Sequence, residues 1–193
     1  MLPTIVFLRH GETNWNVEGR MQGQRDIPLN DNGRAQAKRN GHAIITAIPD
    51  IASYDFVASP LGRARETMEI ARLAMGLDPS AYHLDDRLRE ITFGEWEGFT
   101  TAELRNAHGE LVETREKDKW SFLPPGGESY RLLAERVEAW LAGIKRPTMA
   151  VSHGGVGRVL RRYLHDLDPQ AAVTMSFPQD QALLIKNGST EWI

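Results

Sequence analysis

Short apolar runs alternate with longer amphipathic segments along the whole chain. The runs are rich in branched side chains and too short to be helices, so they predict buried strands. Three runs are clear, at residues 4–10 (TIVFLRH), 54–60 (YDFVASP) and 147–155 (PTMAVSHGG). Residues 81–88 predict a short strand or an extended edge, and residues 181–188 and 190–193 predict closing strands.

The segments between these runs have helical periodicity. Asn30 or Asp31 can cap the first helix, Gly76 closes the second, and the motif LPPGGES ends a polar, helical stretch at residues 100–119. A further helix is predicted at residues 156–167. The positions predicted to face the core are Ala35, Ala37, Ile44, Ile45 and Ile48 in the first helix, Leu61, Ala64, Met68 and Ala71 in the second, and Leu132, Leu133, Val137, Trp140, Leu141 and Ile144 after the LPPGGES motif.

Strands that alternate with helices indicate an α/β fold. We predict a three-layer α/β/α sandwich with a mostly parallel sheet between the helical layers. A length of 193 residues predicts one domain over residues 1–193.

Composition narrows the functional classes. The net charge of −3 gives no general attraction to nucleic acid or to an acidic membrane. The absence of cysteine excludes disulfides and thiolate metal sites. No secretion signal and no run long enough to cross a bilayer is present, so we expect a soluble, cytoplasmic protein with neither membrane nor nucleic-acid partners.

Two of the predicted strands end in the same way, with a histidine followed by a glycine. These pairs are His10–Gly11 and His153–Gly154. Ligands of parallel sheets bind at the carboxyl ends of strands, so both imidazoles are expected at one site. A lone histidine would more often be a surface or core residue, but the repeated placement favours function.

Two arginines are also expected at this site. Arg9 precedes His10, and Arg63 stands at the start of the helix after the second strand. A cation at a helix N-terminus is repelled by the positive end of the helix dipole. The position of Arg63 is explained if an anion binds between its guanidinium and the helix end. The alternative is a solvated Arg63 beside Glu66 or Glu69.

The residue types suit phosphoryl chemistry. Arginine binds two phosphate oxygens at once, and neutral imidazole is a competent nucleophile. Metal-ligand carboxylates at recognisable spacing are absent, so arginine and histidine would have to balance the charge on a phosphoryl group. A carboxylic acid could come from Glu90, Glu95 or Glu97, and the chemistry alone does not choose among them.

The motifs, taken together, resemble those of the histidine phosphatase superfamily in its phosphoglycerate-mutase-like branch. LRHGETNWN resembles the opening signature, GRMQGQRDIPLNDNGRAQA the following segment, and SPLGRARET the second arginine motif. LREITFGEWEG resembles the acid motif and VSHGG the second histidine motif. Their order and spacing cover nearly the whole chain, which implies a phosphoglycerate-mutase-like fold.

The resemblance implies a role for each site residue. His10 would be the nucleophile, Glu90 the proton donor, and Arg9, Arg63 and His153 the groups that hold the phosphoryl oxygens. Asn16 would donate a further hydrogen bond, while Gln22, Gly23 and Gly154 would lie against the substrate or keep the backbone close to it. The implied activity is metal-independent, cofactor-free hydrolysis of a small phosphorylated metabolite.

Two other functions remain open. A phosphomutase would need a longer insertion after the acid motif, a C-terminal tail and an asparagine at the place of Gly155, and this chain shows none of them. A non-catalytic binding module is disfavoured because every expected core residue is present. The chain also resembles broad-specificity and α-ribazole phosphatases, and sugar or glycerate phosphates are equally compatible, so the substrate stays undecided.

Specificity is expected to reside in residues 99–125, which we call the lid segment because they are predicted to form a helical lid. Its cations could meet an anionic substrate tail or could be solvated: Arg105, His108, Arg115, Lys117 and Lys119. Trp120 and Phe122 could line the pocket or anchor the lid, and Trp15 and Trp96 are expected to pack. Residues 190–193 could form the edge of a homodimer or a capped sheet edge.

Overall fold

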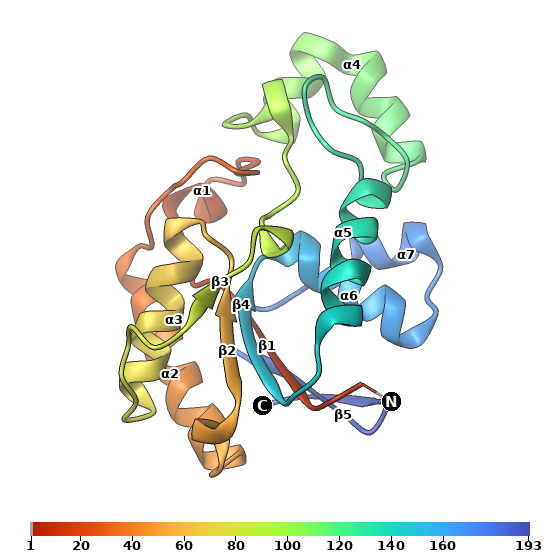
Figure 1. Cartoon of the computed structure of the whole chain (residues 1–193). Helices are drawn as coiled ribbons and strands as arrows, with labels where there is room; N and C mark the ends of the chain where they lie inside the picture. The colour runs from red at the N-terminus through yellow and green to blue at the C-terminus, as the bar shows by residue number, and fades with distance from the viewer. Residues whose placement is uncertain (1) are drawn as a thin grey trace.

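The computed structural model describes residues 2–193, in which a six-stranded sheet lies between layers of helices (Figure 1). The strands are β1 (Ile5–Arg9), β2 (Asp55–Ala58), β3 (His83–Leu84), β4 (Thr148–Ser152), β5 (Ala182–Lys186) and β6 (Ser189–Trp192). Their order across the sheet is β3-β2-β4-β1-β5-β6. β3, β2, β4 and β1 are parallel to one another, β5 is antiparallel to β1, and β6 is antiparallel to β5. The predicted α/β sandwich and mostly parallel sheet are confirmed.

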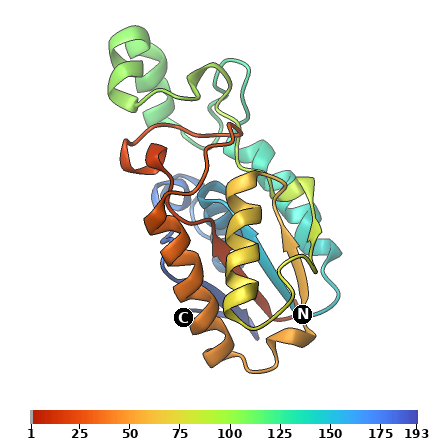
Figure 2. The same ribbon diagram turned by 90° about the vertical axis from the view of Figure 1, so that its left-hand side faces the viewer.

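Helices cover both faces of this sheet (Figures 1 and 2). One layer contains α2 (Asp31–Ala47) and α3 (Gly62–Ala74), and the other contains α5 (Tyr130–Gly143) and α6 (Gly154–His165). Shorter helices are α1 (Asn14–Val17), α7 (Pro169–Thr174) and the 3-10 turns η1 (Ile51–Ser53), η2 (Asp86–Leu88) and η3 (Gly94–Trp96). Among residues 2–193, no helix combines the length and apolar character that a membrane span requires.

Local chemistry explains where the long helices begin. The side chain of Asn30 accepts a hydrogen bond from the amide of Gly33 and caps α2, as one of the two predicted residues. Ser129, the last residue of LPPGGES, caps α5 through the amide of Leu132. α3 begins without a side-chain cap, at the helix that carries Arg63.

Two apolar cores fill the space on either face of the sheet. One joins the sheet to α2 and α3, and the other joins it to α5 and α6. Ala35 and Leu132, predicted inward, are exposed, and Ile144 is only partly buried just after α5. The buried stripe of α2 instead includes Gly33, Gln36, Asn40 and Gly41, which a count of apolar residues overlooks.

The lid segment projects beyond the sheet (Figure 1). It contains α4 (Thr101–Lys117), which is interrupted by the non-helical backbone of His108. A small apolar cluster of Trp96, Leu104 and Val112 lies at its base. Residues 20 and 100 form a β-bridge there, which ties the lid segment to the chain after β1.

The crossing of α2 and α3 depends on a missing side chain at Gly41. A Cβ there would lie 2.5 Å from the carbonyl oxygen of Ala71 and 2.8 Å from the Cβ of Ala74. We predict that Gly41→Ala lowers the free energy of unfolding by about 1–3 kcal/mol, because the helices must move apart. Gly109→Ala in α4, directly after the interruption at His108, is the control: its Cβ meets open space, so no clash should lower the free energy of unfolding. Urea denaturation measures both, and equal effects of the two substitutions would contradict the crossing argument.

Candidate active site

Three neighbouring strands end side by side and present Ser59, His10 and His153. These residues follow β2, β1 and β4, and β4 lies between the other two in the sheet. The main chain holds the ends in register, since the amides of His10 and Ser59 donate to the carbonyls of Ser152 and Val151 at 2.9 Å. The rings of His10 and His153 consequently lie with their centroids 5.2 Å apart, tilted by 57°.

The imidazole of His10 is buried and held by its own loop. Its Nδ1 lies 2.7 Å from the carbonyl oxygen of Gly11, an acceptor, so the hydrogen-bond network assigns the ring proton to Nδ1. The pKa of His10 is lowered well below its usual value by burial, and then by the charges of Arg63 and Arg9. The ring is therefore neutral at pH 7 and its Nε2 carries a lone pair.

Ser59 determines which nitrogen of the His153 ring carries the proton. Its Oγ lies 2.7 Å from Nε2 of His153, and both residues are fully buried. The hydroxyl already accepts from the amide of Leu61 at 3.4 Å and has no other acceptor for its proton within residues 2–193. The hydroxyl therefore donates to Nε2, which leaves the ring proton of neutral His153 on Nδ1. Burial and the charge of Arg63 lower the pKa of His153 well below its usual value.

Arg9 ends β1 beside the histidines. Its Nη1 donates to the carbonyl of Phe177 at 2.8 Å. Burial and the neighbouring Arg158 lower its pKa to about 10, so it remains a cation at neutral pH. The buried Nε has no partner among the described residues.

Arg63 is almost completely buried near the start of α3. Its Nη1 and Nη2 donate to the carbonyls of Arg25 and Gly23 at 2.6 and 2.7 Å. Gly23 has a φ of +53°, which aims its carbonyl at the guanidinium and favours glycine there. Burial lowers the pKa of Arg63, and its Nε, like that of Arg9, is buried without a partner in residues 2–193.

Buried donors without acceptors are rare, and three of the five in the described part of the chain belong to Arg9, Arg63 and His153, the others being on Arg72 and Arg162. Arg9 Nε, Arg63 Nε and His153 Nδ1 are all unsatisfied in the described part of the chain. Because Arg9, Arg63 and His10 line one cleft of about 200 Å³, this is the arrangement expected of a site that takes an anion.

Asn16 and the 22–23 turn line the same cleft. The carboxamide oxygen of Asn16 accepts from the amide of Thr13 and from Nε2 of Gln179, both at 3.1 Å, so its NH₂ group is the end that can donate to a ligand. Gln22 is buried, and its Oε1 has no partner within residues 2–193. Gly154 opens α6 next to the Nε of Arg9.

The three glutamates are separated by the fold. Glu90 lines the cleft, and its carboxylate accepts from the amides of Ile91 and Gly155 at 2.9 and 3.1 Å. The Oε1 of Glu97 instead accepts from Gln24 N at 3.0 Å, Thr92 Oγ1 at 2.8 Å and Phe93 N at 3.1 Å. Glu95 is exposed outside the cleft. Glu90 is thus the glutamate that lines the same cleft as Arg9, His10 and Arg63.

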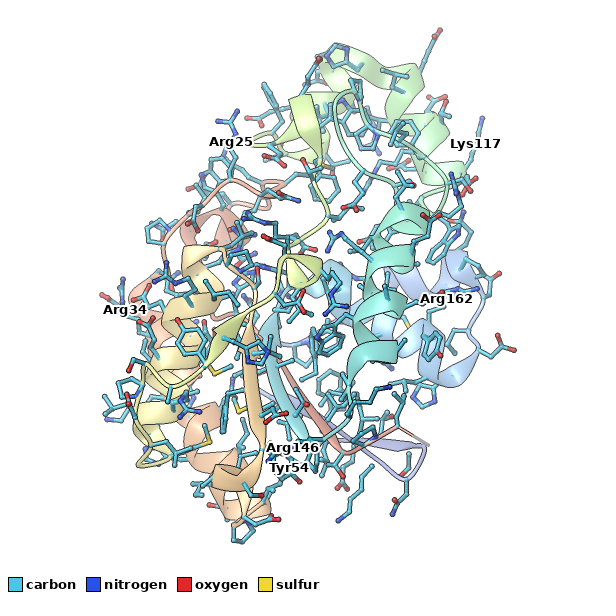
Figure 3. The ribbon with its side chains drawn as sticks, viewed as in Figure 1. Arg25, Arg34, Tyr54, Lys117, Arg146 and Arg162 are labelled. Atoms are coloured by element: carbon cyan, nitrogen blue, oxygen red, sulfur yellow. The ribbon has the colours of Figure 1, made fainter. Side chains whose placement is uncertain are left out.

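The cations and aromatic residues of the lid segment lie in different surroundings. Arg105 pairs with Glu116 at 2.6 Å, His108 is exposed, and Lys117 projects outward from the end of α4 (Figure 3). Arg115 lies over the ring of Phe93, at 5.8 Å from its centroid. Trp120 packs beneath Arg162, and Phe122 against Trp96, so the two aromatics anchor the segment rather than line the cleft.

Sequence reasoning missed three residues that hold the site in shape. These are Ser59, Thr67, whose Oγ1 accepts from the amide of Gly11 at 3.0 Å, and Gln179, which donates to the carbonyl of His10 at 3.0 Å. The position of Ser59 at a strand end was an available signal, because both histidines occupy equivalent places. Thr67 and Gln179 carried no such signal.

Comparisons with known proteins agree with this geometry. The model of the histidine phosphatase superfamily (branch 1) matches residues 5–188. Glucosyl-3-phosphoglycerate phosphatase of Mycolicibacterium vanbaalenii is 34% identical, over 79% of this chain and 69% of that protein. The Salmonella paratyphi C protein named "Probable phosphoglycerate mutase GpmB" is 36% identical, over 78% and 69%.

A solved Escherichia coli K-12 structure, described as "a putative alpha-ribazole-5'-P phosphatase", has 26% sequence identity to this chain. It superposes with a TM-score of 0.81, over 100% of this chain and 95% of that one. Sequence and fold lead to the same assignment: this chain belongs to the histidine phosphatase superfamily, branch 1.

Proposed function

We propose that this protein hydrolyses small phosphomonoesters through a phosphohistidine formed on His10. The observation that carries the proposal is a neutral imidazole with a free Nε2, surrounded by buried donors that lack acceptors. Its family and the phosphatase names of its relatives support the same activity.

The phosphoryl group would occupy the space between the unsatisfied donors. Arg9 and Arg63 supply charge, and His153 supplies a neutral hydrogen bond from Nδ1, with Asn16 adding its NH₂ group. Such donors are fixed before the substrate arrives, so they stabilise the charge on the transferring group without rearrangement.

The chemistry then takes two steps. Nε2 of His10 attacks phosphorus, the bond to the leaving oxygen breaks, and Glu90 gives its proton to that oxygen. Water next attacks the phosphohistidine and loses a proton to Glu90, while the bond between Nε2 and phosphorus breaks and phosphate departs. The first step leaves His10 phosphorylated and Glu90 ionised, and the second returns His10 to its neutral form and Glu90 to its protonated form.

The geometry around Gly155 favours hydrolysis over isomerisation. A Cβ at this position would lie 2.3 Å from Oε1 of Glu90. An asparagine, expected here in a mutase, would therefore displace the proposed acid. The absence of this asparagine supports water as the acceptor of the phosphoryl group, although a relative carries the name "Probable phosphoglycerate mutase GpmB".

Removal of the nucleophile tests the proposal. His10→Ala should abolish hydrolysis of p-nitrophenyl phosphate and the acid-labile ³²P label left on wild type by a slow substrate, because Nε2 is gone. His42→Ala, at an exposed histidine of α2, is the control and should keep both. Wild-type activity should survive EDTA, since no three His, Asp or Glu side chains within residues 2–193 group as metal ligands. An unlabelled wild type, or loss of activity in EDTA, would exclude this mechanism.

Leaving-group dependence tests the acid. Glu90→Gln should slow hydrolysis of an alkyl phosphate by roughly 10²–10⁴-fold, because an alkoxide must be protonated as it departs. p-Nitrophenolate needs little protonation, so p-nitrophenyl phosphate should lose far less. Glu95→Gln, at an exposed glutamate five residues away, is the control for both substrates. Equal losses on the two substrates in Glu90→Gln would remove Glu90 from this role.

The neutral state of the buried histidines predicts a pH dependence of stability. Their folded pKa values lie below those of the unfolded chain, so acid protonates the unfolded state first. The free energy of unfolding should therefore fall as pH drops below about 6.5, by up to about 1.4 kcal/mol per unit for each histidine. Urea denaturation between pH 5 and 6.5 measures how the free energy of unfolding changes with pH. His10→Asn should remove the contribution of one histidine to that slope. In wild type, NMR should show that neither ring titrates near pH 6.5, the usual pKa of histidine; a ring that titrates there contradicts the neutral assignment.

A further inference from the structure

The segment that carries Glu90 has little regular structure of its own. After β3 it forms the turn η2, which packs against α5, and it then continues as irregular chain through Glu90 (Figure 1). The carbonyls of such a chain have no helix or sheet ladder to join, so other donors must satisfy them. Within residues 2–193, the carboxylate of Glu90 accepts only from the backbone amides of Ile91 and Gly155. The position of the carboxylate therefore depends on how the backbone of this segment is held.

One guanidinium, that of Arg136 in α5, holds the segment by its carbonyls. Its Nη1 donates to the carbonyl of Arg87 at 2.7 Å and to that of Arg89 at 2.6 Å. Its Nη2 donates to the carbonyl of Glu90 at 3.1 Å. A single side chain thus fixes both the approach to the proposed acid and the backbone of the acid itself.

Glu128 orients this guanidinium. Its two carboxylate oxygens accept from Nε and Nη2 of Arg136, both at 2.9 Å. Paired bonds of this kind fix the plane of the guanidinium as well as its position. Together with the carbonyls they occupy all five N–H donors of Arg136. The two side chains are only 21% and 16% exposed, so water has little access to replace these bonds.

Glu128 belongs to the motif LPPGGES, for which the proposed chemistry gives no role. The motif also contacts the chain that follows the acid, since the amide of Glu128 donates to the carbonyl of Thr92 at 2.8 Å. Ser129, its last residue, caps α5, and Arg136 lies about two turns further along that helix. The motif and Arg136 therefore secure the backbone on both sides of Glu90.

We propose that Arg136, oriented by Glu128, is a positioning residue for Glu90: its hydrogen bonds to the backbone hold the carboxyl group where it reaches the leaving oxygen. This inference rests on the proposed phosphatase activity and on Glu90 as its proton donor. Arg136 does not line the cleft, so it acts through Glu90 and not on the substrate. A misplacement of about 1 Å can slow a reaction about 10²-fold, so loss of this support should be measurable.

The leaving group shows whether Arg136 acts through the acid. Arg136→Met keeps the apolar stem and removes every N–H donor. It should lower kcat/KM for an alkyl phosphate by about 10–10²-fold and that for p-nitrophenyl phosphate far less, because p-nitrophenolate needs little protonation. Glu128→Gln should give the same selective loss in weaker form, because the guanidinium keeps its carbonyls but loses one carboxylate oxygen.

The same helix offers a matched control. Arg131 pairs with Glu135 at 3.2 Å, and both side chains are exposed. Arg131→Met should leave both rates at the wild-type value. Arg136→Lys keeps a cation beside Glu128 but lacks the planar fork, so it should show the selective loss as well. If urea denaturation shows that Arg136→Met does not fold, Arg136→Lys and Glu128→Gln carry the comparison.

A double variant tests whether the effect passes through Glu90 alone. On the alkyl phosphate, Glu90→Gln combined with Arg136→Met should be no slower than Glu90→Gln by itself. A residue that acts only by placing the acid has nothing left to place once the acid is gone, so the two effects should not add.

The outcomes separate this inference from the proposed function. Equal losses on the two substrates in the Arg136 variants, unchanged rates in a folded one, or a double variant slower than Glu90→Gln would each overturn the positioning role. If Glu90→Gln alone still shows its selective loss, the phosphatase proposal stands in all three cases. If wild type hydrolyses neither substrate, the phosphatase proposal fails first.

Discussion

Two guanidiniums buried at the end of a parallel sheet impose the main constraint on this structure. A buried cation must have its donors satisfied, and no carboxylate is paired with Arg9 or Arg63 in the described chain. The backbone carbonyls of Gly23, Arg25 and Phe177 accept the hydrogen bonds that a carboxylate would otherwise accept. These come from loops far apart in the sequence, so the need to solvate two charges brings the loops to the sheet edge. The donors left without a partner mark the place where we propose that the phosphoryl group binds.

Much of this arrangement was predictable because strand ends in a parallel sheet meet at one edge. The apolar runs located β1, β2 and β4, and the His-Gly pairs after two of them located the site. Membership of the superfamily was predictable from the order of the motifs and is confirmed. The roles of individual residues remain proposals.

Other features could not be obtained from the pattern of residues. Glu90 and Glu97 look alike in sequence, and only their hydrogen-bond partners distinguish a carboxylate in the cleft from one that holds a turn. Gln179 acts from a loop 169 residues beyond His10, a distance that no periodicity reveals. Leu132 was placed wrongly because α5 turns the adjacent pairs Leu133–Ala134 and Trp140–Leu141 toward the core, which leaves Leu132 outside the buried stripe.

Glu97 links the two ends of the cleft. One of its oxygens accepts from Gln24, in the turn whose carbonyls hold Arg63, and from Phe93, beside which Arg115 lies. The turn that holds Arg63 and the backbone of Phe93 thus depend on the same carboxylate. Loss of that carboxylate would release both at once, so a single glutamate outside the cleft ties together two of its walls.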